Sequence, residues 1–149
     1  MIPPLEAALV ALREGEEPAR REAIEVLRGS SHPDAIPALL LAVSDDSWSV
    51  RQAAIEALAG LSRDSLLPSL EVALRDGADA GQRNAAMEIY VRLGALAGPP
   101  LLALLTDADE EVRLFAAVML GAIKEPRAVP ALIEALSDQD LNVRHAAAA

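Results

Sequence analysis

Arginine recurs along this chain with a period of about 31 residues. The five arginines of the series stand 31, 32, 30 and 31 positions apart. A guanidinium group can form two parallel hydrogen bonds with one carboxylate, and acidic residues precede it, as in Asp46 before Arg51. The pattern therefore predicts a structural ladder in which each arginine bridges a turn carboxylate of its own repeat or of the adjacent one. The ladder consists of Arg20, Arg51, Arg83, Arg113 and Arg144.

Glutamate stands five residues after the arginine in three of the repeats. These positions, Glu25, Glu56 and Glu88, lie off the apolar stripe of their predicted helices. Stacked repeats would therefore bring the three carboxylates into a row. The row is either a solvated face or a binding stripe for a basic peptide or helix. A metal site is disfavoured, because carboxylates on neighbouring helices would lie roughly 8–10 Å apart.

The fourth repeat replaces this pattern with apolar side chains. Val118 takes the place of the glutamate, and Leu114 and Phe115 stand where other repeats have polar residues or alanine. Together the three residues predict an exposed apolar patch, and such patches mark interfaces in soluble proteins. The alternative is that the fifth helix pair covers them.

Trp48 and Tyr90 are two of only three aromatic residues in the chain. Trp48 follows Asp46 and Ser47 at the predicted start of a second helix. Its ring either covers the turn between the helices, which the usual burial of large rings slightly favours, or anchors a bound partner. Tyr90 takes a stripe position that leucine holds in other repeats, so we expect its ring in the core.

Residues that could carry catalysis are sparse. The two histidines, His32 and His145, lie more than a hundred positions apart, and the chain has no cysteine. The sequence contains no Gly-rich phosphate loop, nucleophile elbow or cluster of zinc-ligand residues. We therefore predict that the protein is not an enzyme and uses no metal and no other cofactor.

The composition narrows the class of partner. A net charge of −10 and a pI of about 4.6 oppose binding to nucleic acid and to anionic membranes, because lysine and arginine bind phosphate groups. The same charge argues against an anion-binding groove along the arginines. A basic or amphipathic protein segment is the expected partner. The N-terminal stretch MIPPLEAALVALREGEE lacks the features of a signal peptide or membrane span, so a cytoplasmic protein is expected.

Each arginine belongs to a repeating pair of predicted helices. In residues 34–61, Pro37 stands in the first turn of a first helix, and an acidic turn leads to a second helix. The second helix carries Val50 and Leu58 on one buried face. A period of this length is typical of repeat arrays, so we predict a single array over the whole chain, 1–149. Its repeats fall at about 4–29, 34–61, 66–94, 98–123 and 128–149.

Two places depart from the repeat. Gln82 precedes the third arginine where other repeats have valine, and Gly77 and Gly81 flank the turn of that repeat, so a looser or re-angled turn is expected there. The chain ends in HAAAA in the middle of a predicted helix. Because solenoid ends usually carry a polar capping repeat, we expect these residues to be a fragment of a longer array, truncated at the C-terminal end. The open end would then allow self-association.

The helix pattern D-x-x-V-R-x-x-A-x-x-A-L, followed by P-A-L-x-x-A-L-x-D, resembles the short HEAT-like repeats first described in phycobilisome lyases. The resemblance covers nearly the whole chain. It implies an all-α, right-handed α-solenoid of about five helix-pair repeats of about 31 residues, whose second helices line the concave surface. HEAT-like hydroxylases hold iron with His–Glu motifs, and neither His32 nor His145 is followed by glutamate.

These observations predict a non-enzymatic protein-interaction scaffold or regulatory module. A basic, amphipathic segment of a partner would lie across the concave face. The alternative is an accessory subunit, lyase-like or chaperone-like, of an enzyme system, and a third possibility is a structural array that self-associates. The expected partner contacts are Glu25, Glu56, Glu88, Trp48, Leu114, Phe115 and Val118.

Overall fold

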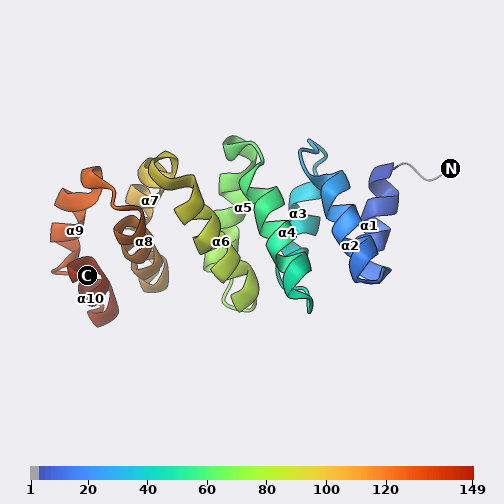
Figure 1. Ribbon diagram of the computed structural model, residues 1–149. Helices are drawn as coiled ribbons and strands as arrows, with labels where there is room; N and C mark the ends of the chain where they lie inside the picture. The colour runs from blue at the N-terminus through green and yellow to red at the C-terminus, as the bar shows by residue number, and fades with distance from the viewer. Residues whose placement is uncertain (1–3) are drawn as a thin grey trace. The chain divides into compact units, whose positions relative to one another are not determined.

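The computed structural model describes residues 4–149 and is all-helical over that range (Figure 1). The chain divides into two compact units, unit 1 over residues 1–86 and unit 2 over residues 87–149. Helix α6 passes from one unit into the other. Each unit consists of helix pairs joined by short turns, so the predicted all-α class with helix-pair repeats is confirmed.

Unit 1 is built from the first five helices and the beginning of α6. Its elements are α1 (Pro4–Glu14), α2 (Glu17–Leu27), α3 (Ala35–Ala42), α4 (Trp48–Ala59), α5 (Arg63–Arg75) and α6 (Ala80–Leu93). The pairs α1–α2 and α3–α4 pack within themselves, and α2 also packs along α4. The first helices α1 and α5 each contact α3. First helices therefore meet first helices, and second helices meet second helices.

Unit 2 repeats the arrangement with shorter first helices. Its elements after α6 are the 3₁₀ helix η1 (Gly94–Ala97), α7 (Gly98–Leu104), α8 (Glu110–Ile123), η2 (Pro126–Ala128), α9 (Val129–Ala135) and α10 (Leu141–Ala148). The pairs α7–α8 and α9–α10 pack within themselves, and the second helices α8 and α10 pack together.

Prolines and acidic residues mark most helix starts. Pro99 and Pro130 occupy the first turn of α7 and α9, where a missing N–H costs no hydrogen bond. Side-chain oxygens of Asp109 and Asp140 accept backbone N–H groups at the starts of α8 and α10. The third repeat differs, since α5 begins before Pro68 and holds this proline inside the helix.

Alanine and leucine form the core of both units. The alanine three residues after each of the first four ladder arginines is at most 3% exposed, which lets adjacent helices approach closely. These residues are Ala23, Ala54, Ala86 and Ala116. Tyr90 is buried, as predicted. The apolar stripe of each second helix thus faces the core and leaves its opposite side available for function.

The turn between α5 and α6 contains one additional residue. Seven positions separate Asp76 from Arg83, whereas six separate Asp45 from Arg51. In this longer turn Asp79 accepts hydrogen bonds from the Ser44 hydroxyl and the Gln82 N–H, both at 2.9 Å. A Cβ atom on Gly81 would collide with the Ser44 hydroxyl. Glycine therefore allows this turn to lie against the preceding one.

Candidate functional site

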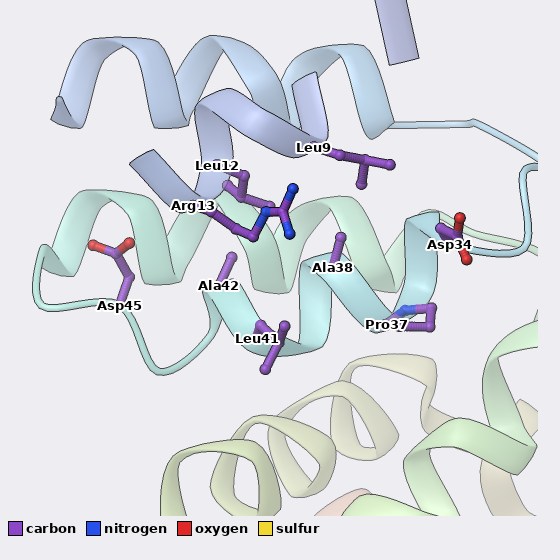
Figure 2. A pocket seen from close by; sticks show the side chains of 9 residues that line it. All are labelled: Leu9, Leu12, Arg13, Asp34, Pro37, Ala38, Leu41, Ala42 and Asp45. Carbon is purple, nitrogen blue, oxygen red and sulfur yellow. The ribbon is translucent and has the colours of Figure 1, made fainter. Parts of the chain in front are cut away.

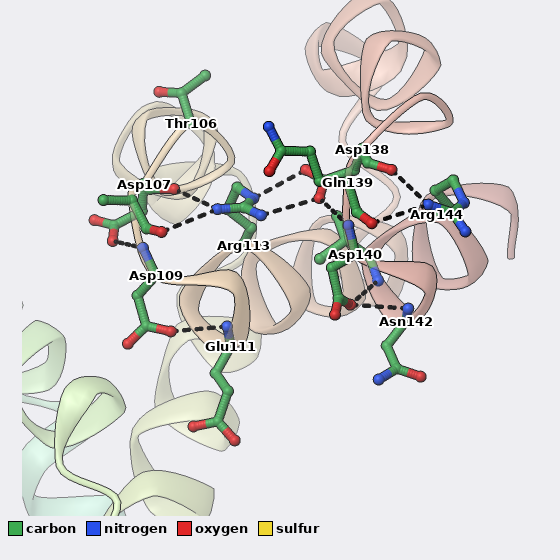
Figure 3. Close-up of polar contacts among 12 residues, drawn as sticks. Thr106, Asp107, Asp109, Glu111, Arg113, Asp138, Gln139, Asp140, Asn142 and Arg144 are labelled. Atoms are coloured by element: carbon green, nitrogen blue, oxygen red, sulfur yellow. Dashed lines mark hydrogen bonds and ion pairs between the residues drawn. The ribbon is translucent and has the colours of Figure 1, made fainter.

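Arg113 of α8 links two successive turns in unit 2 (Figure 3). Its Nη1 donates to the backbone carbonyls of Asp107 and Ala108 in its own turn, at 2.9 and 3.2 Å. Its Nε and Nη2 donate to the two carboxylate oxygens of Asp138 in the next turn, at 2.9 and 3.0 Å. These bonds, together with the N–H of Asp140, hold the pKa of Asp138 below its usual range. One side chain therefore joins two repeats.

Arg20 of α2 forms the same link in unit 1. Its Nη1 donates to the Gly15 carbonyl at 2.9 Å, and its Nη2 donates to Asp45 and Asp46, each at 2.9 Å. Its Nε lies 2.8 Å from the other oxygen of Asp45. The aspartate stands 25 positions after the arginine, as it does for Arg113 and Asp138. The side chains of Arg20 and Asp45 are both largely buried.

The remaining arginines of the ladder differ. Arg51 and Arg144 donate to carbonyls of their own turns at 2.7–3.1 Å, and within residues 4–149 neither forms an ion pair. Asp76, 25 positions after Arg51, instead accepts the N–H of Ala78 in the lengthened turn. Arg83 lies half-buried on α6. The ladder is thus a structural device that is incomplete between the second and third repeats.

Two of the three predicted glutamates are neutralised within their own helices. Glu25 accepts two hydrogen bonds from Arg28, at 2.9 and 3.0 Å, which lower its pKa. Glu88, in unit 2, lies 2.8 Å from Nη2 of Arg92. Glu56 on α4 is exposed, and no ion pair involves it within the described residues. The alignment of the three carboxylates in one row remains a prediction.

Trp48 is the first residue of α4 and is 67% exposed. The expectation that its ring is buried over the turn is therefore wrong. The structure leaves the ring in solvent because residues at this position, the first of a second helix, lie outside the apolar stripe. Gln52 and Glu56 follow at intervals of four residues, so the three side chains share one stripe of α4.

The apolar residues of the fourth repeat lie on α8 in unit 2. Leu114 and Phe115 are half-buried, and Val118 is 44% exposed. The three residues share one helix, and they are separated along the chain from Trp48 of unit 1. Their role as partner contacts remains a prediction.

Glu125 is a buried carboxylate that the repeat pattern did not reveal. It is 7% exposed and precedes η2. Its carboxylate accepts hydrogen bonds from the backbone N–H, Nε and Nη2 of Arg127, each at 2.9 Å. Arg127 also donates to the carbonyl of Ala95 at 3.1 Å. The pair joins the turn before α9 to the turn before α7, close to the buried Gly98.

Acidification is expected to destabilise the fold through Glu125. Hydrogen bonds from Arg127 lower the pKa of Glu125 from 4.5 to about 2. A carboxylate whose folded pKa is lowered stabilises the fold above its unfolded pKa, and this contribution is lost as the pH falls through the folded pKa. Wild type and Glu125→Gln should therefore differ in free energy of unfolding by a constant amount near neutral pH. Urea unfolding at a series of pH values should show the difference shrinking between 4.5 and about 2. A difference independent of pH would contradict the assignment.

An apolar groove on the first helices was also missed (Figure 2). It has a volume of about 430 Å³ and lies between α1 and α3. Leu9 and Leu12 of α1 line it together with Ala38, Leu41 and Ala42 of α3. The sequence signal for this groove is the 31-residue spacing of the first helices, and the proline and aspartate positions alone do not reveal it.

Within residues 4–149 no cluster of three or more His, Cys, Asp or Glu residues could hold a metal ion. The stretch Ala80–Leu104 is long and apolar enough to cross a membrane by length and composition alone. It comprises α6, η1 and α7 and includes the charged residues Arg83, Glu88 and Arg92. Core helices of soluble proteins pass the same test.

Comparison with known proteins identifies the family. The HEAT repeats family model matches residues 2–89 and 98–149, so the chain belongs to the HEAT repeat family. A search of curated proteins finds no match. A designed armadillo repeat protein in complex with the peptide (KR)4 is 21% identical, with 97% of this chain and 79% of that chain covered and a TM-score of 0.40. A computationally designed armadillo repeat protein for modular peptide recognition has the same identity and coverage and a TM-score of 0.38.

Proposed function

We propose that this HEAT-repeat chain is a non-enzymatic protein-interaction module that binds a basic, amphipathic segment of a partner through its second helices. Repeat arrays present extended surfaces of this kind. The observation that carries the proposal is the stripe on α4, where the exposed ring of Trp48 stands two turns before Glu56, which forms no ion pair within the described residues.

The chemistry of this stripe fits an amphipathic partner. Exposed aromatic rings are frequent anchors in interfaces, and a lysine or arginine can stack on tryptophan or pair with a nearby carboxylate. An apolar side chain of the partner would cover Trp48, while a basic side chain about two turns away would reach Glu56. The overall net charge of −10 favours the approach of a basic segment.

The adjacent helix α2 adds to the acidic side of the stripe. Glu17 is exposed on α2 and accepts a hydrogen bond from the hydroxyl of Ser49 of α4 at 2.9 Å. Glu25 is already paired with Arg28, so a basic partner residue would have to displace that arginine. We therefore expect Glu56 to contribute more to binding than Glu25. In unit 2, Val118 and the half-buried Leu114 and Phe115 supply a second apolar contact.

Reversing three charges tests the proposal. In a pull-down from the source lysate, the variant Glu25→Lys, Glu56→Lys, Glu88→Lys should lose a protein that wild type captures. The affinity for that protein should fall about tenfold and depend less on salt. Because Trp48 is the only tryptophan in the chain, its fluorescence on titration with the captured protein shows whether the ring becomes buried.

A variant with the same change in net charge is the control. Glu6→Lys, Asp64→Lys, Glu134→Lys places the substitutions at exposed positions of the first helices α1, α5 and α9. This control should retain the partner. If both variants lose the captured protein equally, binding depends on net charge alone and not on the proposed face. Capture by both variants with unchanged Trp48 fluorescence would refute the proposed face.

A further inference from the structure

Packing between the first two repeats follows a simple rule. In the groove of Figure 2, the large side chains Leu9 and Leu12 of α1 face the small side chains Ala38 and Ala42 of α3. The helices α1 and α3 are in contact. A ridge of large residues on one first helix therefore packs against small residues on the next.

The ridge positions recur with a constant period of 31 residues. Those equivalent to Leu12 are buried in the three middle repeats, where exposure is 2–6%. The series is Leu12, Val43, Leu74, Leu105 and Leu136. The position equivalent to Leu9 in the fifth repeat is Ile133, and the positions equivalent to Ala38 and Ala42 in the first repeat are Ala7 and Ala11.

In the part of the chain that the structure describes, no element covers this ridge on helix α9. Val129, Ile133 and Leu136 are 52%, 61% and 44% exposed. Their spacing of four and three residues places them on one face of the helix. The position of Leu136, which is buried at the three middle repeats, is thus exposed at the fifth, and together with Val129 and Ile133 it forms an exposed apolar surface, the α9 ridge.

Helices α1 and α2 carry the complementary small-residue surface. A groove of about 280 Å³ lies between them, with Glu22 and Pro4 also bordering it. Val26 in this groove is 44% exposed, although its counterparts Ala57, Ile89 and Met119 are fully buried. The apolar lining of this surface, the α1–α2 groove, is Ala7, Ala8, Ala11, Ala19, Ala23 and Val26.

The charges at the two surfaces also match the ladder. Glu14 stands 31 positions before Asp45 and therefore occupies the aspartate position of the first repeat. It is exposed, and within residues 4–149 it forms no ion pair. Among the described residues, Arg144 donates only to carbonyls of its own turn. Arg113, its counterpart, reaches both a carbonyl and the aspartate of the following repeat.

We propose that copies of this chain associate head to tail. The α9 ridge of one copy packs into the α1–α2 groove of the next, and Arg144 of the first pairs with Glu14 of the second. The contact continues the repeat-to-repeat interface seen inside each unit. It joins two different surfaces, so every added copy leaves one ridge and one groove free and assembly extends beyond a dimer. This inference is independent of the proposed partner segment.

Sedimentation velocity over a range of protein concentrations tests the proposal. The mean mass of wild type should increase with concentration. Ile133→Glu and Val26→Glu should each remain monomeric, because a carboxylate in the apolar contact stays unpaired. Both positions are exposed, so folding is preserved and circular dichroism verifies it. The matched control is Leu41→Glu, which alters a 66% exposed leucine on α3, and it should assemble like wild type.

The ion pair is tested by mixing variants. Arg144→Glu and Glu14→Arg should each assemble about tenfold more weakly alone, because like charges then face each other across the contact. An equimolar mixture should recover assembly, since each contact then joins opposite charges. Wild type that stays monomeric at every concentration would overturn the proposal. So would assembly that is lost in Leu41→Glu but kept in Ile133→Glu, which would indicate association through the outer side of the first helices.

Discussion

Replacing Gly98 by alanine is expected to destabilise the protein by about 2 kcal/mol, because the new methyl group enters a packed and charged site. A Cβ atom there would lie 2.6 Å from Nη2 of Arg127 and 2.7 Å from Oε2 of Glu125. Both atoms take part in the Glu125–Arg127 pair, so neither can move without weakening it. Urea unfolding followed by circular dichroism measures the effect.

Gly121 provides the matched control within unit 2. It lies inside α8 and is exposed, and a Cβ atom added there would meet no atom within 4 Å beyond the backbone of its own helix. Gly121→Ala should therefore stabilise the protein, by up to about 1 kcal/mol, since alanine favours the helix interior more than glycine. Equal unfolding midpoints for the Gly98→Ala variant and wild type would show that the site accommodates a methyl group.

Replacing Arg113 by methionine is expected to destabilise the protein by about 2 kcal/mol, because charged hydrogen bonds are lost while the aliphatic stem is kept. The substitution removes four hydrogen bonds and leaves Asp138, whose side chain is 12% exposed, without its cation. The loss is measured as a shift of the unfolding midpoint. A double-mutant cycle with Asp138→Asn separates the ion pair from the carbonyl contacts.

Arg51→Met is the comparison for Arg113→Met. Arg51 donates to the Asp45 and Asp46 carbonyls and forms no ion pair within the described part of the chain. Its replacement should cost clearly less. If the two variants lose equal stability, the stabilising element is the carbonyl contact within each turn, and the link between repeats adds little.

The 31-residue period was sufficient to predict the helix pairs, because proline, aspartate and arginine each mark a fixed place in the repeat. The spacing also predicted which residue types meet in the ladder. It could not predict that Arg51 forms no ion pair with Asp76, because this depends on how the backbone accommodates the additional residue of the third turn. The spacing also misplaced the start of α5, which begins at Arg63 and contains Pro68 in its interior.

The candidate site was harder to predict than the fold. The sequence contains a signal for the ion pairs of Glu25 and Glu88, because an arginine follows three and four residues later. The predicted acidic row considers only the glutamate position in each repeat and not these arginines. The exposure of Trp48 depends on the direction of one side chain at a helix start, which composition does not specify. Glu125 follows no periodic pattern, and its burial arises from packing between successive turns.

The lengthened third turn has a mechanical consequence. In a linear array each boundary bears the full load, so the boundary with the weakest link separates first under tension. Between the second and third repeats the Ser44–Asp79 hydrogen bond takes the place of an arginine–aspartate bridge. Under a pulling force on unit 1, this boundary should therefore open before the Arg20–Asp45 boundary. Amide hydrogen exchange should likewise be faster at this boundary than at the Arg20–Asp45 boundary. A single inserted residue thus gives unit 1 a mechanically weak boundary between its second and third repeats.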